Sequence, residues 1–108
     1  MLTTEQQDFY DQNGYLMVEN VITKDQLNKL QTITYEFIEA SRNIKENDDI
    51  FDLDVGHSAD NPRLTRIKLP HKQNKYFDEI LKNSGVTEVL RDLLGDNATL
   101  LTSKLNTK

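Results

Sequence analysis

The sequence from residue 94 onward constrains the fold most, because it predicts a helix end followed directly by a β-strand. Gly95 suits the left-handed position that ends a helix. A strand is expected over residues 99–105, with Lys104 and Lys108 on one side as the pattern continues to the terminus. A strand needs neighbours that satisfy its backbone N–H and C=O groups, and only short candidates precede it. We therefore expect the chain to be the front part of a larger β-rich domain.

Size and composition narrow the class of protein. The chain has 108 residues, a net charge of −5 and a pI of about 4.9, which argues against nucleic acid or an anionic membrane as a partner. Cysteine is absent, so disulfides and thiolate metal sites are excluded. The polar start has no apolar core of a signal peptide, and we expect a soluble cytoplasmic protein whose organelle stays open. At 36% apolar residues, its own core would be small.

Three capping signals predict helices. Thr3 with Gln6 forms a capping box that opens a helix ending at Gly14, and Thr23 with Gln26 opens a second helix over residues 24–41. Ser84 can cap a helix that ends at Gly95. Apolar residues at helical spacing predict one packed face on the second and the last helix. Those residues are Leu27, Leu30, Ile33, Phe37 and Ile38, and then Val86, Val89, Leu90 and Leu93.

Shorter patterns predict strands and one more helix. Residues 15–18 and 51–55 each indicate a brief strand. Thr65, Ile67 and Leu69 alternate with Arg66 and Lys68, which is typical of a strand with one buried face, and Pro70 ends that pattern. A short helical face follows, formed by Phe77, Ile80 and Leu81.

One polar cluster has the residue types of a metal site. Asp52, Asp54 and His57 offer oxygen and nitrogen ligands that suit a divalent ion. The alternative is two acids on the outer face of a short strand beside a polar turn. His71 is the only other histidine, so a complete site of two histidines and one carboxylate is not expected from this chain alone. Asn97 begins a formal glycosylation sequon, but no secretory signal supports its use.

Basic residues gather in the second half of the sequence. Arg66 and Lys68 point the same way on a strand, and such a pair suits a dicarboxylate or a phosphate. The alternative is an exposed strand face that its charge keeps soluble. Lys104, on the last strand, has the same two interpretations.

Several pieces of sequence, taken in order, resemble the phytanoyl-CoA dioxygenase family. Each piece is weak alone, but together they span nearly the whole chain in the family's order. The pieces are residues 2–9 and 13–22, then Gly56-His57-Ser58 with residues 62–68, and finally residues 92–97 leading into Thr102-Ser103-Lys104-Leu105-Asn106.

This resemblance implies an α+β fold in which helices flank the first strands of an incomplete double-stranded β-helix, or jelly roll. It implies an oxygenase that uses Fe(II) and 2-oxoglutarate to hydroxylate a small organic substrate. By resemblance, Arg66 falls where relatives often have a basic 2-oxoglutarate contact, more often a lysine, and Lys104 falls at a second position near that cosubstrate.

The family's iron ligands are expected beyond the matched strand. We therefore expect residues 1–108 to be the N-terminal part of one such domain, truncated before the metal-binding motif, with no metal ligands or catalytic residues of its own. We expect Fe(II) and 2-oxoglutarate to belong to the full-length protein and not to be bound by this chain alone. We also expect little or no hydroxylase activity and possible self-association through open strand edges. The alternative function is a small helical protein-binding module or a regulatory short form, with the stripe over residues 27–38 or 86–93 as its docking face.

Overall fold

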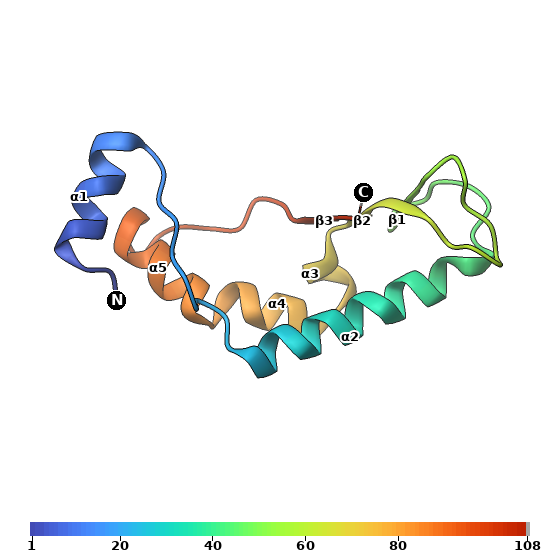
Figure 1. The fold of residues 1–108 in the computed structure, drawn as a ribbon, viewed down its shortest axis with the longest axis horizontal. Coiled ribbons are helices and arrows are strands. Elements are labelled where there is room, and N and C mark those ends of the chain that lie inside the picture. The colour runs from blue at the N-terminus through green and yellow to red at the C-terminus, as the bar shows by residue number, and fades with distance from the viewer. Residues whose placement is uncertain (108) are drawn as a thin grey trace.

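Helices and short antiparallel strands together build the chain (Figure 1). A computed structural model describes residues 1–107, with extents of 50 × 27 × 23 Å. This mixture confirms the predicted α+β class, whereas the jelly roll stays a prediction. In order, the elements are α1 (Thr4–Asn13), α2 (Lys24–Ala40), the 3-10 turn η1 (Ser41–Asn43), β1 (Phe51–Leu53), β2 (Leu64–Lys68), α3 (Pro70–Gln73), α4 (Lys75–Lys82), α5 (Gly85–Leu94) and β3 (Lys104–Asn106).

The predicted capping residues start the helices. In α2 the hydroxyl of Thr23 accepts a hydrogen bond from the Gln26 N–H at 3.1 Å, and the Gln26 side chain accepts from the Thr23 N–H at 2.9 Å. Thr3 and Gln6 do the same for α1. Ser84 accepts from the Val86 N–H at the start of α5. These side chains satisfy N–H groups that a helix start leaves unpaired.

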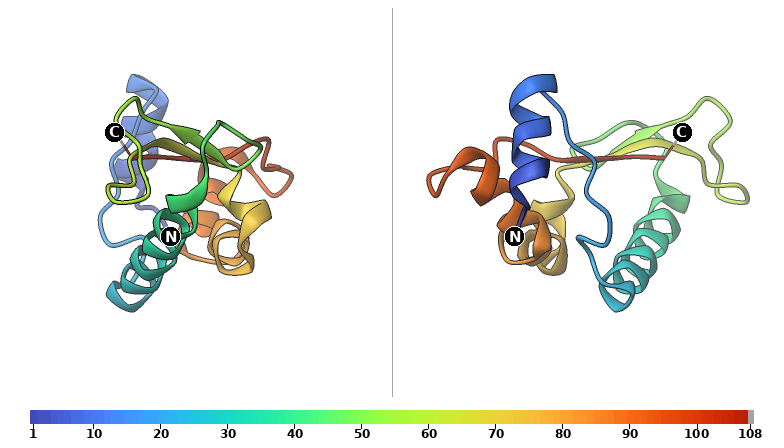
Figure 2. Two further views of the ribbon diagram at one scale, coloured as in Figure 1. Left: turned by 90° about the vertical axis from the view of Figure 1, so that its right-hand side faces the viewer. Right: turned by 60° about the vertical axis from the view of Figure 1, so that its left-hand side comes forward.

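The three strands form one antiparallel sheet in the order β1-β2-β3, and the C-terminal end of α2 reaches one face of it while the rest of the helix runs away from the sheet (Figure 2). The core of this region is a cluster of Phe51, Leu64 and Ile67, against which Phe37 and Ile38 of α2 pack. Ile67, on the central strand, is completely buried. The predicted stripe on α2 therefore packs inside the molecule, with the exception of its first residue, Leu27, which is exposed.

Because of a bulge, the buried residues of β2 differ from those that the alternation predicted. Asp52 pairs with Arg66 while the next residue, Leu53, pairs with Leu64, so Thr65 is an extra residue. In a regular strand, residues three apart face opposite sides, yet Leu64 and Ile67 share one core. The buried set is thus Leu64 and Ile67, because the extra residue turns Leu64 inward. Leu69 leaves the strand in the left-handed conformation, at φ 51°, and precedes α3.

Two other strand predictions were wrong. Residues 15–18 belong to the connection between α1 and α2 and form no strand. The last strand begins at Lys104 instead of residue 99. Its pairing starts where the Leu69 N–H donates to the Ser103 carbonyl, and β2 reaches no further because Pro70 begins α3. Residues 99–102 therefore have no ladder partner to join.

The connection between α1 and α2 crosses the start of α5 at close range. A Cβ atom added at Gly85 would lie 2.2 Å from the carbonyl oxygen of Val21, closer than any real side chain approaches. Glycine at this position therefore permits the backbone contact between the connection and α5.

Candidate anion-binding face of the sheet

The face of the sheet opposite the core carries charged and polar side chains. Strand pairing sets Asp52 opposite Arg66, Arg66 opposite Asn106, and Lys68 opposite Lys104. Paired residues of an antiparallel sheet project from the same side, so all five share one surface. We call this surface the charged face, defined by Asp52, Arg66, Lys68, Lys104 and Asn106.

Asp52 binds both cations of the central strand. Its Oδ2 lies 3.1 Å from Nε of Arg66, and its Oδ1 lies 3.1 Å from Nζ of Lys68. The Arg66 side chain is 46% exposed and that of Asp52 is 22% exposed. Ion pairs this close to solvent contribute little stability, typically up to about 1 kcal/mol each. Their main effect is to fix where the two cationic groups lie.

The third cation of the charged face is Lys104, an exposed residue of the edge strand. Among residues 1–107 it makes no ion pair. It sits diagonally across from Arg66, a relationship that places Cβ atoms roughly 7–8 Å apart. A carboxylate could therefore accept hydrogen bonds from Arg66 and Lys104 at once.

A second acid lies near this face. Two backbone N–H groups, of Phe51 and Ile50, donate to the Asp48 carboxylate at 2.7 and 2.8 Å. These hydrogen bonds, helped by the nearby Lys68 charge, lower the pKa of Asp48 below its usual value. The charged face together with Asp48 thus holds three basic and two acidic side chains, on a chain whose total charge is −5.

Both predicted cosubstrate contacts, Arg66 and Lys104, thus lie on one face, although their role stays a prediction. The pairing of Asp52 with the two cations was missed from the sequence, where it was considered as a metal ligand or a solvated acid. The alternation over residues 51–53 and 66–68 does indicate two adjacent strands, but it does not give their register, because the bulge at Thr65 shifts which residues pair.

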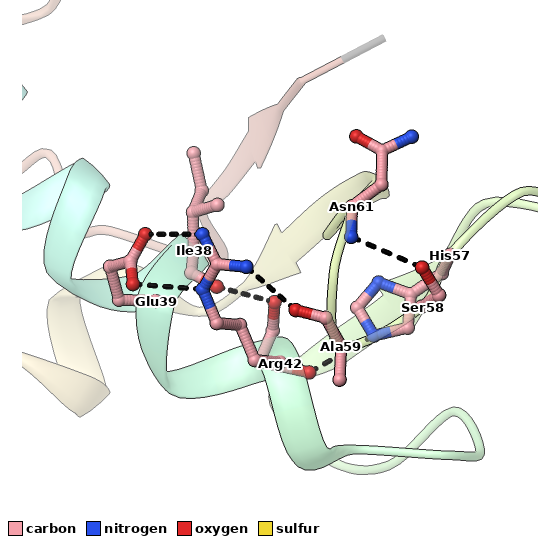
Figure 3. Close-up of polar contacts among 8 residues, drawn as sticks. Ile38, Glu39, Arg42, His57, Ser58, Ala59 and Asn61 are labelled. Carbon is pink, nitrogen blue, oxygen red and sulfur yellow. Dashed lines mark hydrogen bonds and ion pairs between the residues drawn. The ribbon is translucent and has the colours of Figure 1, made fainter.

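Hydrogen bonds of the polar cluster around His57 hold the loop between β1 and β2 against the residues that follow α2 (Figure 3). The Arg63 N–H donates to Nδ1 of His57 at 3.0 Å, which leaves Nε2 to donate to the buried Ser41 carbonyl at 3.0 Å. Arg42 donates to the Ala59 carbonyl from the same end of α2. Asp54 pairs with Arg63 at 3.5 Å, and Asp52 faces the cations described above. Both ring nitrogens of His57 are thus engaged, and the metal interpretation of this cluster is not supported.

The expected iron does not fit the described residues. Residues 1–107 contain no group of three or more His, Cys, Asp or Glu side chains that could hold a metal ion. His71, the other histidine, makes a hydrogen bond between its Nδ1 and the hydroxyl of Ser103. The charged face, in contrast, fits the carboxylates of 2-oxoglutarate, because it offers the N–H donors that such groups accept.

A cavity of about 840 Å³ lies away from the sheet and is bordered by α3, α4, α5 and residues 95–100. Leu90 and Leu94 of α5 and Leu100 line it, and these three are 40%, 59% and 43% exposed.

None of the helices within residues 1–107 has the length and apolar character that crossing a bilayer requires.

Two curated proteins are similar to the chain. A "Probable phytanoyl-CoA dioxygenase" of Caenorhabditis elegans is 28% identical over 100 residues, which cover 89% of this chain and 32% of that protein. A "Probable alpha-ketoglutarate-dependent hypophosphite dioxygenase" of Stutzerimonas stutzeri is 22% identical over 104 residues, which cover 96% of this chain and 36% of that protein.

The resemblance to the phytanoyl-CoA dioxygenase family is confirmed. The chain spans about a third of the length of the curated relatives that it matches. No protein-family model matches it.

Proposed function

We propose that these residues form the N-terminal part of a non-haem Fe(II)/2-oxoglutarate-dependent dioxygenase that hydroxylates a small organic substrate. The observation that carries this proposal is the similarity of nearly the whole chain to two dioxygenases, of which it covers about a third. In the complete enzyme, iron with 2-oxoglutarate supplies the oxidising chemistry. The iron ligands come from sequence beyond the residues described here.

Within this proposal, the charged face forms one wall of the 2-oxoglutarate pocket. Arg66 and Lys104 donate hydrogen bonds to a carboxylate of the cosubstrate, and Lys68 adds positive charge beside them. Strand β3 is paired on one side only among residues 1–107 and leaves an edge for further strands. The outer edge of β1 is capped by the loop before it, since the N–H groups of Phe51 and Leu53 donate to the side chains of Asp48 and Asn47. Additional strands at β3 would extend the sheet toward a jelly roll, and without them this edge favours self-association of the chain.

The first test separates binding from turnover. The purified chain should show no Fe(II)-dependent consumption of 2-oxoglutarate. Because Arg66 and Lys104 share one face, we now expect weak binding of 2-oxoglutarate where the sequence predicted none. Millimolar 2-oxoglutarate should therefore shift the amide NMR signals of β2 and β3. Arg66→Ala and Lys104→Ala should each weaken this binding about fivefold, since an exposed charge-assisted contact contributes about 1 kcal/mol. Lys45→Ala removes an exposed lysine from a polar loop and should leave binding unchanged.

Two results would contradict the proposal. Turnover of 2-oxoglutarate by the chain alone would show that it holds a complete iron site. Equal weakening by Lys45→Ala would show that the ligand senses only the total charge of the protein.

The alternative function is a helical binding module, for which two docking surfaces were predicted. One of these surfaces is mostly covered within the molecule. Phe37 and Ile38 of the α2 stripe pack against the core of the sheet and Ile33 is buried, so most of the stripe is not available to a partner. The α5 stripe has no fully buried residue. It is the surface on which that alternative now depends.

A further inference from the structure

We propose that Asp52 sets how tightly the charged face binds a carboxylate, by acting as an internal competitor for Arg66 and Lys68. This inference rests on the proposed function, in which the face receives 2-oxoglutarate. It concerns a residue whose role does not follow from the similarity to dioxygenases.

The first argument is geometric. Each oxygen of Asp52 takes one cation, at 3.1 Å in both cases, so this carboxylate already occupies the arrangement that an external dicarboxylate would seek. It uses the Nε edge of Arg66. Among residues 1–107, Asp52 is the only acid paired with Arg66, whose side chain is 46% exposed and so accessible to a ligand.

The second argument is electrostatic. The Asp52 side chain is only 22% exposed, which makes its charge less screened than that of a fully solvated acid. A ligand carboxylate bound to Arg66 would therefore lie near a fixed negative charge of the same sign. Like charges at such range repel, and the repulsion lowers the affinity. The neighbouring Lys104 has no acid partner among the described residues. It attracts the ligand carboxylate and so raises the affinity.

The test uses the whole chain and 2-oxoglutarate as the probe, with binding followed by NMR titration at low salt. Asp52→Asn keeps the side-chain shape and one oxygen acceptor but removes the charge. We expect it to bind 2-oxoglutarate about fivefold more tightly than the unmodified chain. Asp8→Asn, on the exposed surface of α1, changes the net charge equally and should leave the affinity unchanged.

A reciprocal variant keeps the proposal testable even where Asp52→Asn does not fold. Asn106 lies opposite Arg66 on the exposed edge strand, so Asn106→Asp places a second carboxylate beside the same guanidinium. It should weaken 2-oxoglutarate binding about fivefold. Retained circular dichroism confirms that each variant is folded.

The outcomes are distinct. Unchanged or weaker binding by a folded Asp52→Asn, or unchanged or tighter binding by Asn106→Asp, overturns the role of Asp52 and leaves the proposed function standing. If neither the unmodified chain nor Asp52→Asn binds 2-oxoglutarate, the charged face receives no carboxylate, and both proposals fall.

Discussion

The sheet end and the α5 end of the molecule bury their apolar side chains to very different degrees. At the sheet, Leu64 and Ile67 are 6% and 0% exposed beneath α2. At the other end, Leu90 and Leu94 of α5 are 40% and 59% exposed. Both regions carry clear apolar patterns in the sequence. The comparison teaches that such a pattern becomes a core only where a second element faces it, as α2 faces the sheet.

The largest expected effect tests this contrast directly. Ile67→Ala should lower the free energy of unfolding by about 3 kcal/mol, because it leaves a cavity at a fully buried site. Leu94→Ala should change it by less than about 0.5 kcal/mol, because the side chain is already solvated. Urea denaturation measures both. Equal losses would show that the two ends are packed alike.

The next effect asks whether the α5 end folds together with the remainder. Gly85→Ala should destabilise by about 2 kcal/mol or more, because its new Cβ would meet the Val21 carbonyl and force the two segments apart. Gly14→Ala is the matched control. It has an open surrounding at φ +78° and should cost about 1 kcal/mol from its left-handed backbone alone. Thermal denaturation of both variants tests the difference.

A smaller cost at Gly85 than at Gly14 would change the comparison. It would mean that the connection and α5 separate easily, and that the α5 end contributes little to the cooperative unit.

The smallest expected effect is the loss of stability at acid pH that Asp48, at the sheet end, causes. Hydrogen bonds lower the pKa of Asp48 in the folded chain, so its charge stabilises the fold above the ordinary value of 3.8, and this contribution is lost as pH falls through the folded value. Asp48→Asn should lower the melting temperature at pH 7 by about 2 °C, because the carboxylate is exposed. The gap should close at strongly acid pH.

Asp49→Asn serves as the control for this titration, since Asp49 is the exposed neighbour in the same loop. A gap between Asp48→Asn and the unmodified chain that does not depend on pH would show that the amide disturbs the loop itself instead of removing a charge.

Local signals predicted much of the fold, and pairing signals did not. Thr3, Thr23 and Ser84 marked helix starts correctly, because a cap depends on residues three apart in the sequence. The strand at residues 15–18 was wrong, since a strand depends on a distant neighbour that the local pattern does not reveal.

The candidate site follows the same division. Arg66 and Lys104 were selected by resemblance, and the register of β2 with β3 sets them on one face. Asp52 was assigned no such role, because its ion pairs depend on how β1 and β2 align. That alignment includes a bulge, which no residue in the sequence announces.

The bulge at Thr65 also has an evolutionary consequence. In a regular strand, successive side chains alternate between the two faces of the sheet. Inserting one residue would therefore move every following side chain to the opposite face. In β2 the bulge accommodates the additional residue, so the side chains before and after Thr65 each stay on their own face of the sheet. Related chains can therefore gain or lose a residue at this point while the cations stay in water and the aliphatic groups stay under α2.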